Sequence, residues 1–224
     1  MNKKLILLFS MILLIGFTAN AQYKKFNFGL KAAPQVSWMR TNADTYSSEG
    51  ARLGFGWGFC SEINFTENHS FATGFNVLFN GGKLKYPDIQ STDTGTMLRT
   101  YKLKSIEIPL TLKMRTNPIG DFQYFGQIGF GTSFLLNAKG DDEFTYGTDT
   151  YDDGGNLSNV AFLRESLIIG LGAEYTLDAG TTLGLGLQFN NGFTDILTGK
   201  NAVDASIKEK AYTNFIELNA FVLF

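Results

Sequence analysis

Seven charged residues recur within stretches where apolar and polar side chains alternate. They are Lys31, Glu62, Glu107, Lys113, Arg164, Glu174 and Glu217. Each belongs to the polar half of its stretch, so all seven are expected on one side of a β-sheet. Charges held away from bulk water are costly unless they pair. These residues therefore predict a lumen polar network, either a structural set of salt bridges or the switchable ion pairs of a polar pore.

Residues that support catalysis are scarce. The chain has one histidine, His69, and one cysteine, Cys60. Hydrolytic sites often rely on a histidine that activates a nucleophile or water, and His69 lies in a short predicted turn far from the Ser and Asp of the longer polar segments. Cys60 reads as a small packing residue, and a single cysteine excludes a disulfide framework or a multi-cysteine zinc site. We expect no catalytic residue, no metal and no cofactor.

A polar segment at residues 137–160 concentrates carboxylates among Gly and Tyr. Its acids are Asp141, Asp142, Glu143, Asp149, Asp152 and Asp153. Oxygen ligands of this kind suit Ca²⁺, but the run that begins at Asp149 lacks the spacing of an EF-hand loop. The sequence leaves calcium binding open, and a solvated acidic loop is the commoner outcome. Tyr146 and Tyr151 stand beside the acids and suggest a contact surface for a cell-envelope protein partner.

Composition limits the protein's class. Of the 224 residues, 44% are hydrophobic and 18% charged, and the formal net charge is −2. A disordered chain would be poorer in apolar residues. The charge balance gives no basic footprint for nucleic acid. We therefore expect a folded protein of one domain with no nucleic-acid partner.

The first 21 residues have the three parts of a secretory signal peptide. Lys3 and Lys4 precede an apolar run from Leu5 to Phe17, and Ala19 to Ala21 supply small residues before a cleavage site at Gln22. The apolar run is shorter than the ~20 residues that a spanning helix needs. We expect residues 1–21 to be removed and residues 22–224 to form the exported domain.

Period-2 patterning recurs along the exported chain and predicts about eight strands. The segments are 26–30, 53–65, 71–79, 106–114, 128–134, 167–175, 183–189 and 216–224. One face of each is large and apolar, for example Phe55, Phe75 and Leu185. The other face is mostly Gly, Asn, Gln and Ser with isolated charges, which suits a narrow barrel interior better than a water-facing surface.

This pattern predicts a transmembrane antiparallel up-and-down β-barrel whose apolar side faces outer membrane lipid. A soluble exported β-barrel is the alternative, because it alternates too. The connections favour the membrane barrel, since long polar segments at 37–50, 83–100, 137–160 and 194–211 alternate with short turns at 66–70, 115–121 and 178–181. Outer membrane barrels have short periplasmic turns and longer extracellular loops, so we expect a protein of the outer membrane of a Gram-negative-type bacterium.

Two irregularities are expected in the strand at 103–114. Leu103 and Ile106 are out of phase by one residue, which predicts a bulge between Lys104 and Ser105. Pro109 removes a ladder donor, which usually marks an edge strand or a bulge.

Three motifs resemble the small porin-family or PorT-like outer membrane β-barrel domain. They are residues 101–113 (YKLKSIEIPLTLK), 170–175 (GLGAEY) and 188–196 (QFNNGFTDI). The terminal Phe224 resembles the C-terminal aromatic that the barrel-assembly machinery recognises, so the C-terminal strand is expected to carry the assembly signal. The resemblance implies a barrel fold. We expect a structural or interaction barrel with a lumen filled by side chains, and the alternative is a narrow channel for ions or small solutes.

Overall fold

The structure is a computed structural model that describes residues 24–90, 92–147, 149–177 and 180–224. The predicted signal peptide lies outside these residues. The described chain forms ten β-strands: β1 Phe26–Arg40, β2 Ser47–Ser48, β3 Ala51–Asn64, β4 His69–Gln90, β5 Asp93–Arg115, β6 Phe122–Tyr146, β7 Asp149–Asn156, β8 Leu163–Thr176, β9 Thr182–Gly192 and β10 Tyr212–Leu223. None of the described residues forms a helix long and apolar enough to cross a bilayer.

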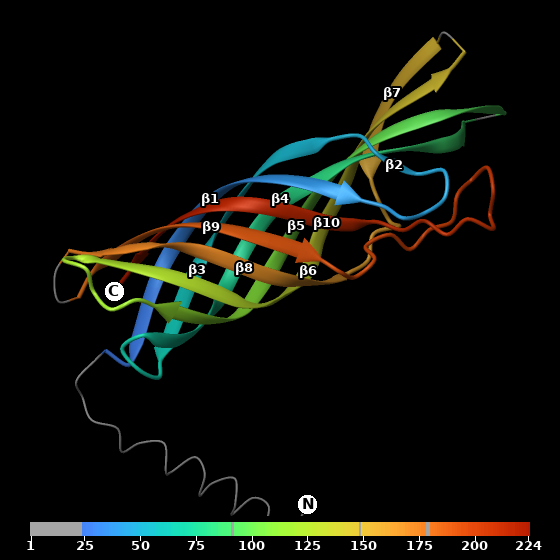
Figure 1. Ribbon diagram of the computed structural model, residues 1–224. Helices are drawn as coiled ribbons and strands as arrows, with labels where there is room; N and C mark the ends of the chain where they lie inside the picture. Colours follow the sequence, from blue (N-terminus) through green and yellow to red (C-terminus); the bar gives the residue numbers. More distant parts are fainter. Residues whose placement is uncertain (1–23, 91, 148, 178–179) are drawn as a thin grey trace, which may run out of the picture.

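Eight of these strands close into an antiparallel ring (Figure 1). Around the ring the order is β1, β3, β4, β5, β6, β8, β9 and β10, and β10 pairs with β1 to complete it. The short strands β2 and β7 pair with β4 and β6 outside this circuit. Each of the eight segments predicted from the alternation lies in a different strand of the ring, so the predicted all-β barrel of eight strands is confirmed.

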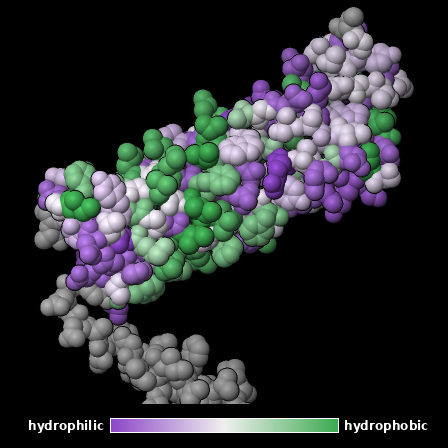
Figure 2. Space-filling view, viewed as in Figure 1, coloured by the Kyte–Doolittle hydropathy of each residue, from purple (hydrophilic) through white to green (hydrophobic). Residues whose placement is uncertain are grey.

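The apolar side chains of the ring point outward. Phe55, Phe75 and Leu185 are 43%, 45% and 55% exposed, whereas the intervening positions are buried inside the ring. A band of hydrophobic residues crosses the middle of the barrel and gives way to polar residues at both ends (Figure 2). Such a band is what a transmembrane barrel presents to lipid. The interpretation as a soluble barrel is therefore wrong, because its bulky side chains would fill the centre.

Glycine makes room for the few aromatic rings that enter the interior. A Cβ at Gly184 would lie 2.0 Å from Cζ of Phe221, and one at Gly172 would lie 2.6 Å from Cζ of Phe125. An eight-stranded ring is only wide enough for its own side chains. Phe125 and Phe221 can therefore point inward only because the residues opposite them are small.

The barrel has two unlike ends. The turn end carries the short connections 65–68, 116–121 and 177–181, together with the first described residues and the C-terminus. The loop end carries the longer segments, including the irregular stretch 193–211. The short connections lie at one end as predicted, but the predicted long loops at 83–100 and 137–160 are largely strand.

Several of the predicted loops prove to be strands instead. β4 runs to Gln90 and β5 begins at Asp93, while β6 runs to Tyr146 and pairs with β7. These strands outrun their ring neighbours, since β3 pairs with β4 only as far as Phe79 and β8 pairs with β6 only as far as Phe134. We call residues 81–90, 93–104, 137–146 and 149–156 the extension; it projects from the loop end in Figure 1. Most of its outward residues are polar, so the sequence of this region is similar to that of a loop.

The two irregularities of β5 have separate outcomes. The β5–β6 register shifts between Lys104 and Ser105, as predicted, and the extra residue, Leu136, is on β6. Pro109 is neither at an edge nor at this shift. It pairs with Gly131 of β6, and on its other side the ladder with β4 is interrupted between the pairs Thr73–Leu110 and Asn76–Glu107. The register is the same on both sides of this gap, so the gap coincides with the residue that has no N–H to donate.

The charged interior as candidate functional site

A quartet of charges occupies the interior near the turn end. The Lys113 ammonium lies 2.6 Å from Oε1 of Glu62 and also pairs with Glu174. The Arg115 guanidinium pairs with the same two carboxylates and donates to Oγ of Ser70 at 2.9 Å. Two cations thus face two anions, all buried. This balance is what keeps buried charge tolerable.

Arg115 is the member of the quartet that the sequence did not single out. It stands at the last position of β5, and the sequence analysis assigned it to the following turn. The signal was present, because Lys113 and Arg115 are two residues apart and therefore share one face of a strand. Residue spacing alone would have placed Arg115 beside Lys113.

A second group of interior charges lies farther along the barrel. Lys31 of β1 donates to Glu217 of β10 at 3.0 Å. Glu107 of β5 lies 3.7 Å from the Arg164 guanidinium and accepts from Asn190 at 2.8 Å and from Asn76 at 3.3 Å. The structure thus places all seven predicted residues inside the ring, and each has an oppositely charged partner.

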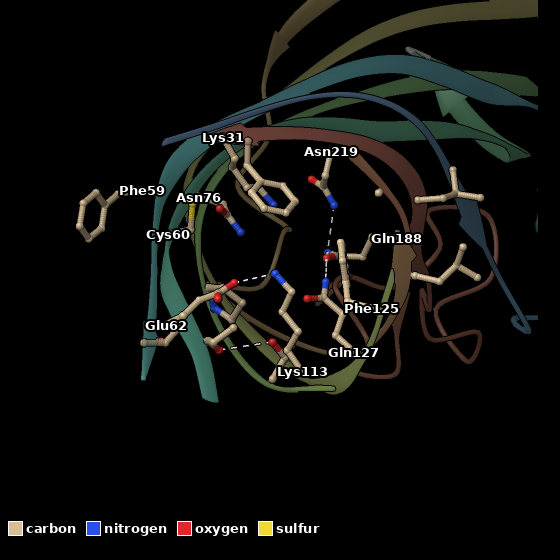
Figure 3. Close-up of a pocket in the computed structure, with 18 residues that line it drawn as sticks. Lys31, Phe59, Cys60, Glu62, Asn76, Lys113, Phe125, Gln127, Gln188 and Asn219 are labelled. Atoms are coloured by element: carbon tan, nitrogen blue, oxygen red, sulfur yellow. Dashed lines mark hydrogen bonds and ion pairs between the residues drawn. The ribbon is translucent and has the colours of Figure 1, made fainter. Parts of the chain in front are cut away.

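A small cavity lies between the two groups. It has a volume of about 70 Å³, and its lining includes apolar residues such as Leu171 and Leu187. The other lining residues include Lys31, Cys60, Glu62, Asn76, Lys113, Gln127, Gln188, Asn219, Phe125 and Phe221. Figure 3 shows the labelled side chains of Asn76, Lys113 and Gln188 pointing into the interior from different walls. Gln127 donates to Gln188 at 2.6 Å. The cavity is large enough for water and offers it polar partners.

The Lys113 ammonium also contacts aromatic rings. It lies 4.2 Å from the ring centre of Phe125 and 4.7 Å from that of Phe221. A cation over an aromatic face is stabilised by the ring quadrupole. Lys113 is therefore held by two carboxylates and two rings, which favours a fixed position over a swinging gate.

The interior changes character at the loop end, where a buried hydrophobic cluster replaces the charges. Its members are Met39, Tyr46, Leu84, Tyr86, Met97, Tyr101, Leu103, Ala138, Phe144, Ile196, Leu197 and Ala211. They come from β1, β4, β5 and β6 and from the segments 41–50 and 193–211. Side chains from opposite sides of the barrel mouth therefore meet in one packed core.

Polar contacts tie the segment 193–211 to this core. The hydroxyl of Tyr46 donates to Glu209 at 3.2 Å and accepts from Asn201 at 3.1 Å, and Asn201 also donates to the carbonyl of Pro87 at 2.8 Å. The ring of Tyr46 stacks on Tyr86 with centroids 4.7 Å apart. Burial raises the pKa of Tyr101 to about 12 and raises that of Tyr86 further. These hydroxyls are therefore shielded from bulk solvent.

The acidic segment forms the hairpin of β6 and β7 instead of a loop. Asp142 accepts from the Arg99 guanidinium at 2.6 and 2.5 Å, and Asp141 pairs with Lys102. Two of the acids thus have protein cations as partners. Among the described residues no three His, Cys, Asp or Glu side chains converge on a point where a metal ion would sit.

The remaining singled-out residues lie apart from the interior charges. His69 begins β4 at the turn end, where its Nδ1 lies 3.0 Å from Oγ1 of Thr66. Phe224 follows β10, is 55% exposed and exchanges two backbone hydrogen bonds with Phe28 of β1. The terminal aromatic therefore stands at the seam where the ring closes.

The sequence matches the family model "Outer membrane protein beta-barrel domain" over residues 13–198. The chain belongs to this family. With the outward apolar band, this makes it a β-barrel protein of the outer membrane of a Gram-negative-type bacterium. No curated protein sequence matches the chain.

Solved structures of other outer membrane proteins are similar at low identity. Neisserial surface protein A is 15% identical over 89% of this chain and 96% of its own, with a TM-score of 0.47. OprG from Pseudomonas aeruginosa is 10% identical over 91% and 98%, with a TM-score of 0.43. Ail, the attachment invasion locus protein of Yersinia pestis, is 11% identical over 90% and 100%, with a TM-score of 0.37. Likeness at this level carries no argument about function.

Proposed function

We propose that the protein is a structural and interaction barrel whose lumen is closed by side chains and whose loop end contacts other components of the cell envelope. The observation that carries this proposal is the hydrophobic core at the loop end. Ions cross a pore through water or polar groups, and a packed core of Met, Leu, Tyr and Phe offers neither. The charge quartet near the turn end supports the same conclusion, because its cations and anions are matched.

Conductance in planar bilayers tests the proposal. The purified protein is expected to insert without producing steady current. The variants Glu107→Ala and Lys113→Ala are expected to remain silent, because neither removes the loop-end core. Stable, ion-selective openings of the native protein that change with Glu107→Ala or Lys113→Ala would overturn the closed-lumen proposal.

A narrow channel is the second candidate, and the cavity near Lys31 and Lys113 favours it. In that case the hydrophobic core would have to move aside, together with the segment 193–211. A double variant Tyr46→Ala/Phe144→Ala that weakens the core discriminates the two. A closed barrel is expected to gain conductance only in this variant, whereas a channel would conduct before the core is touched.

We propose that the interaction role uses outward residues of the loop end. Tyr146 and Tyr151 are 47% and 57% exposed and stand on the hairpin of β6 and β7, which supports a protein partner there. Phe224, where β10 pairs with β1, supports recognition of the C-terminal strand by the barrel-assembly machinery. The motifs at 101–113, 170–175 and 188–196 support the narrower PorT-like assignment.

The proposed protein partner can be tested with the two exposed tyrosines. Crosslinking in intact membranes, followed by pull-down with native protein and with Tyr146→Ala/Tyr151→Ala, is expected to lose the partner in the variant.

A further inference from the structure

The outer face of the extension carries a group of lysines next to the apolar band. Strand register places residues in rows across β4, β5 and β6, because paired residues of antiparallel strands point to the same face. Phe79, Lys104 and Asn137 form one row, Gly81, Lys102 and Lys139 the next, and Lys83, Thr100 and Asp141 the third. We call Lys83, Lys102, Lys104 and Lys139 the lysine face.

The register forces two like charges together on this face. Lys102 of β5 and Lys139 of β6 are directly paired, and residues opposite each other across antiparallel strands lie about 5 Å apart at Cα. Like charges directly opposite are destabilising. Lys102 has a partner in Asp141, and both side chains of that pair are well exposed. No ion pair within the described residues involves Lys83, Lys104 or Lys139. Lys104 and Lys139 therefore add positive charge to this face that no ion pair within the described residues offsets.

The position of the lysine face relative to the lipid-facing band is fixed by the same rows. The Lys104 ammonium lies 5.5 Å from the ring centre of Phe79, which is an outward aromatic residue of β4. The row on the other side of Lys104 holds the apolar pair Ile106 and Phe134. A strand advances about 3.3 Å per residue, so Lys102 and Lys139 stand about 7 Å beyond the edge of the apolar band. That is the level at which lysine side chains reach headgroups along an apolar surface.

We infer that the lysine face binds phosphate groups of the phosphorylated lipid that surrounds the loop end of the barrel. A phosphate within reach of two or three of these ammonium groups would supply the negative charge that the strand pairing does not. The apolar residues beside Lys104 would contact the acyl chains of the same molecule. Continuity with the lipid-facing band is what favours a lipid over a soluble anion or an acidic protein.

The acids of the same outer face are arranged to permit this contact. Glu143 and Asp152 form a row with Leu98 that lies farther from the apolar band than Lys102, Lys104 and Lys139. Asp141 pairs with Lys102, and Lys83 lines a groove together with acids of this outer end. Negative charge thus increases away from the headgroup level. This inference rests on the membrane placement of the barrel and is independent of whether the lumen conducts.

Binding of bis-phosphorylated lipid A to the protein in neutral detergent tests the inference, with native mass spectrometry as the readout. The native protein is expected to bind it and to bind dephosphorylated lipid A far more weakly. The variant Lys102→Gln/Lys104→Gln/Lys139→Gln is expected to bind phosphorylated lipid A on the order of a hundredfold more weakly, since each basic residue near an anionic headgroup contributes about fivefold. Its affinity for the dephosphorylated lipid should stay as in the native protein.

A matched control removes equal charge elsewhere at the same end. Lys200→Gln/Lys208→Gln/Lys210→Gln changes three lysines of the segment 193–211 and is expected to bind phosphorylated lipid A within about threefold of native, because this charge lies outside the headgroup contact. The temperature of thermal unfolding without lipid should change little in the first variant, because relief of the Lys102–Lys139 repulsion offsets the loss of the exposed Lys102–Asp141 ion pair. Native-like binding by the first variant, equal losses in both variants, or no preference for phosphorylated lipid would each overturn the inference.

Discussion

The membrane-spanning part of the barrel and the extension are built from the same strands with inside and outside exchanged. On β5, Leu110 points outward with 46% of its surface exposed, and Glu107 and Lys113 point inward. Farther along β5, Lys102 and Lys104 point outward and Tyr101 is fully buried inside. The direction in which each strand position faces follows one alternation, interrupted only by the register shift at Leu136. In the membrane-spanning part the outward positions are mostly apolar and the inward ones mostly polar, and in the extension the reverse holds.

The exchange follows from the surroundings of each part. Hydrocarbon offers no hydrogen bonds, so the lipid-facing positions must be apolar and polar groups are left to pair inside. In water the extension gains stability by burying its apolar side chains and exposing its charges. A barrel strand that leaves the membrane therefore keeps its period of two and reverses its polarity. The point of reversal lies near Phe79 and Lys104, at the edge of the band.

Removing an interior carboxylate should give the largest difference between the two parts. Glu107→Ala leaves Arg164 buried without its counter-charge, and such a change costs about 3–5 kcal/mol of unfolding free energy. Glu143→Ala removes the same group from the outer face of the extension and is expected to cost less than about 0.5 kcal/mol. Urea-induced unfolding in lipid vesicles measures both. Equal losses in the two variants would show that Glu107 is not paired inside a closed ring.

Placing a charge on the outer face should separate the two parts by a smaller amount. Leu110→Lys and Leu98→Lys are the same change on the outward face of one strand. The first puts an ammonium in the lipid-facing band and is expected to cost roughly 2–4 kcal/mol, whereas the second faces water and is expected to be nearly neutral. The fraction of folded protein on a heat-modifiable gel and the unfolding free energy check the pair. A neutral Leu110→Lys would place Leu110 outside the membrane.

The ring was predictable from the sequence, because its signal repeats in every strand. Stretches such as Leu53 to Phe59 alternate large apolar residues with glycine, a pattern that only a narrow interior explains. The extension was missed for a physical reason. Its inward residues Leu84, Tyr86, Met97 and Tyr101 alternate with Lys and Thr. A water-exposed strand of a soluble protein has the same alternation. Because Gly and Asp are frequent in these segments, the segments were predicted to be loops.

The sequence predicts which charged residues lie inside the barrel, but it does not predict which of them form ion pairs with one another. Period-2 spacing is enough to assign Lys31, Glu107 and Glu174 to the inside. Which carboxylate meets which cation depends on the strand order and the stagger between strands, and these are set by closure of the whole ring. The end of a strand is hard to predict from sequence, as Arg115 shows. A residue at the last position of a strand still points to the face that the alternation gives it, although the alternating pattern ends there.

The depth of the two tryptophans in the bilayer tests the orientation of the barrel most directly. Trp57 lies in the middle of β3 with 48% of its surface exposed, and Trp38 lies near the loop end of β1, stacked on Phe189. Trp38→Phe and Trp57→Phe each leave one fluorophore, whose quenching by lipids brominated at different depths can be measured. Trp57 should be quenched most by bromines deep in the acyl chains and Trp38 by bromines near the headgroup. Quenching of Trp57 by aqueous iodide but not by any brominated lipid would contradict the account.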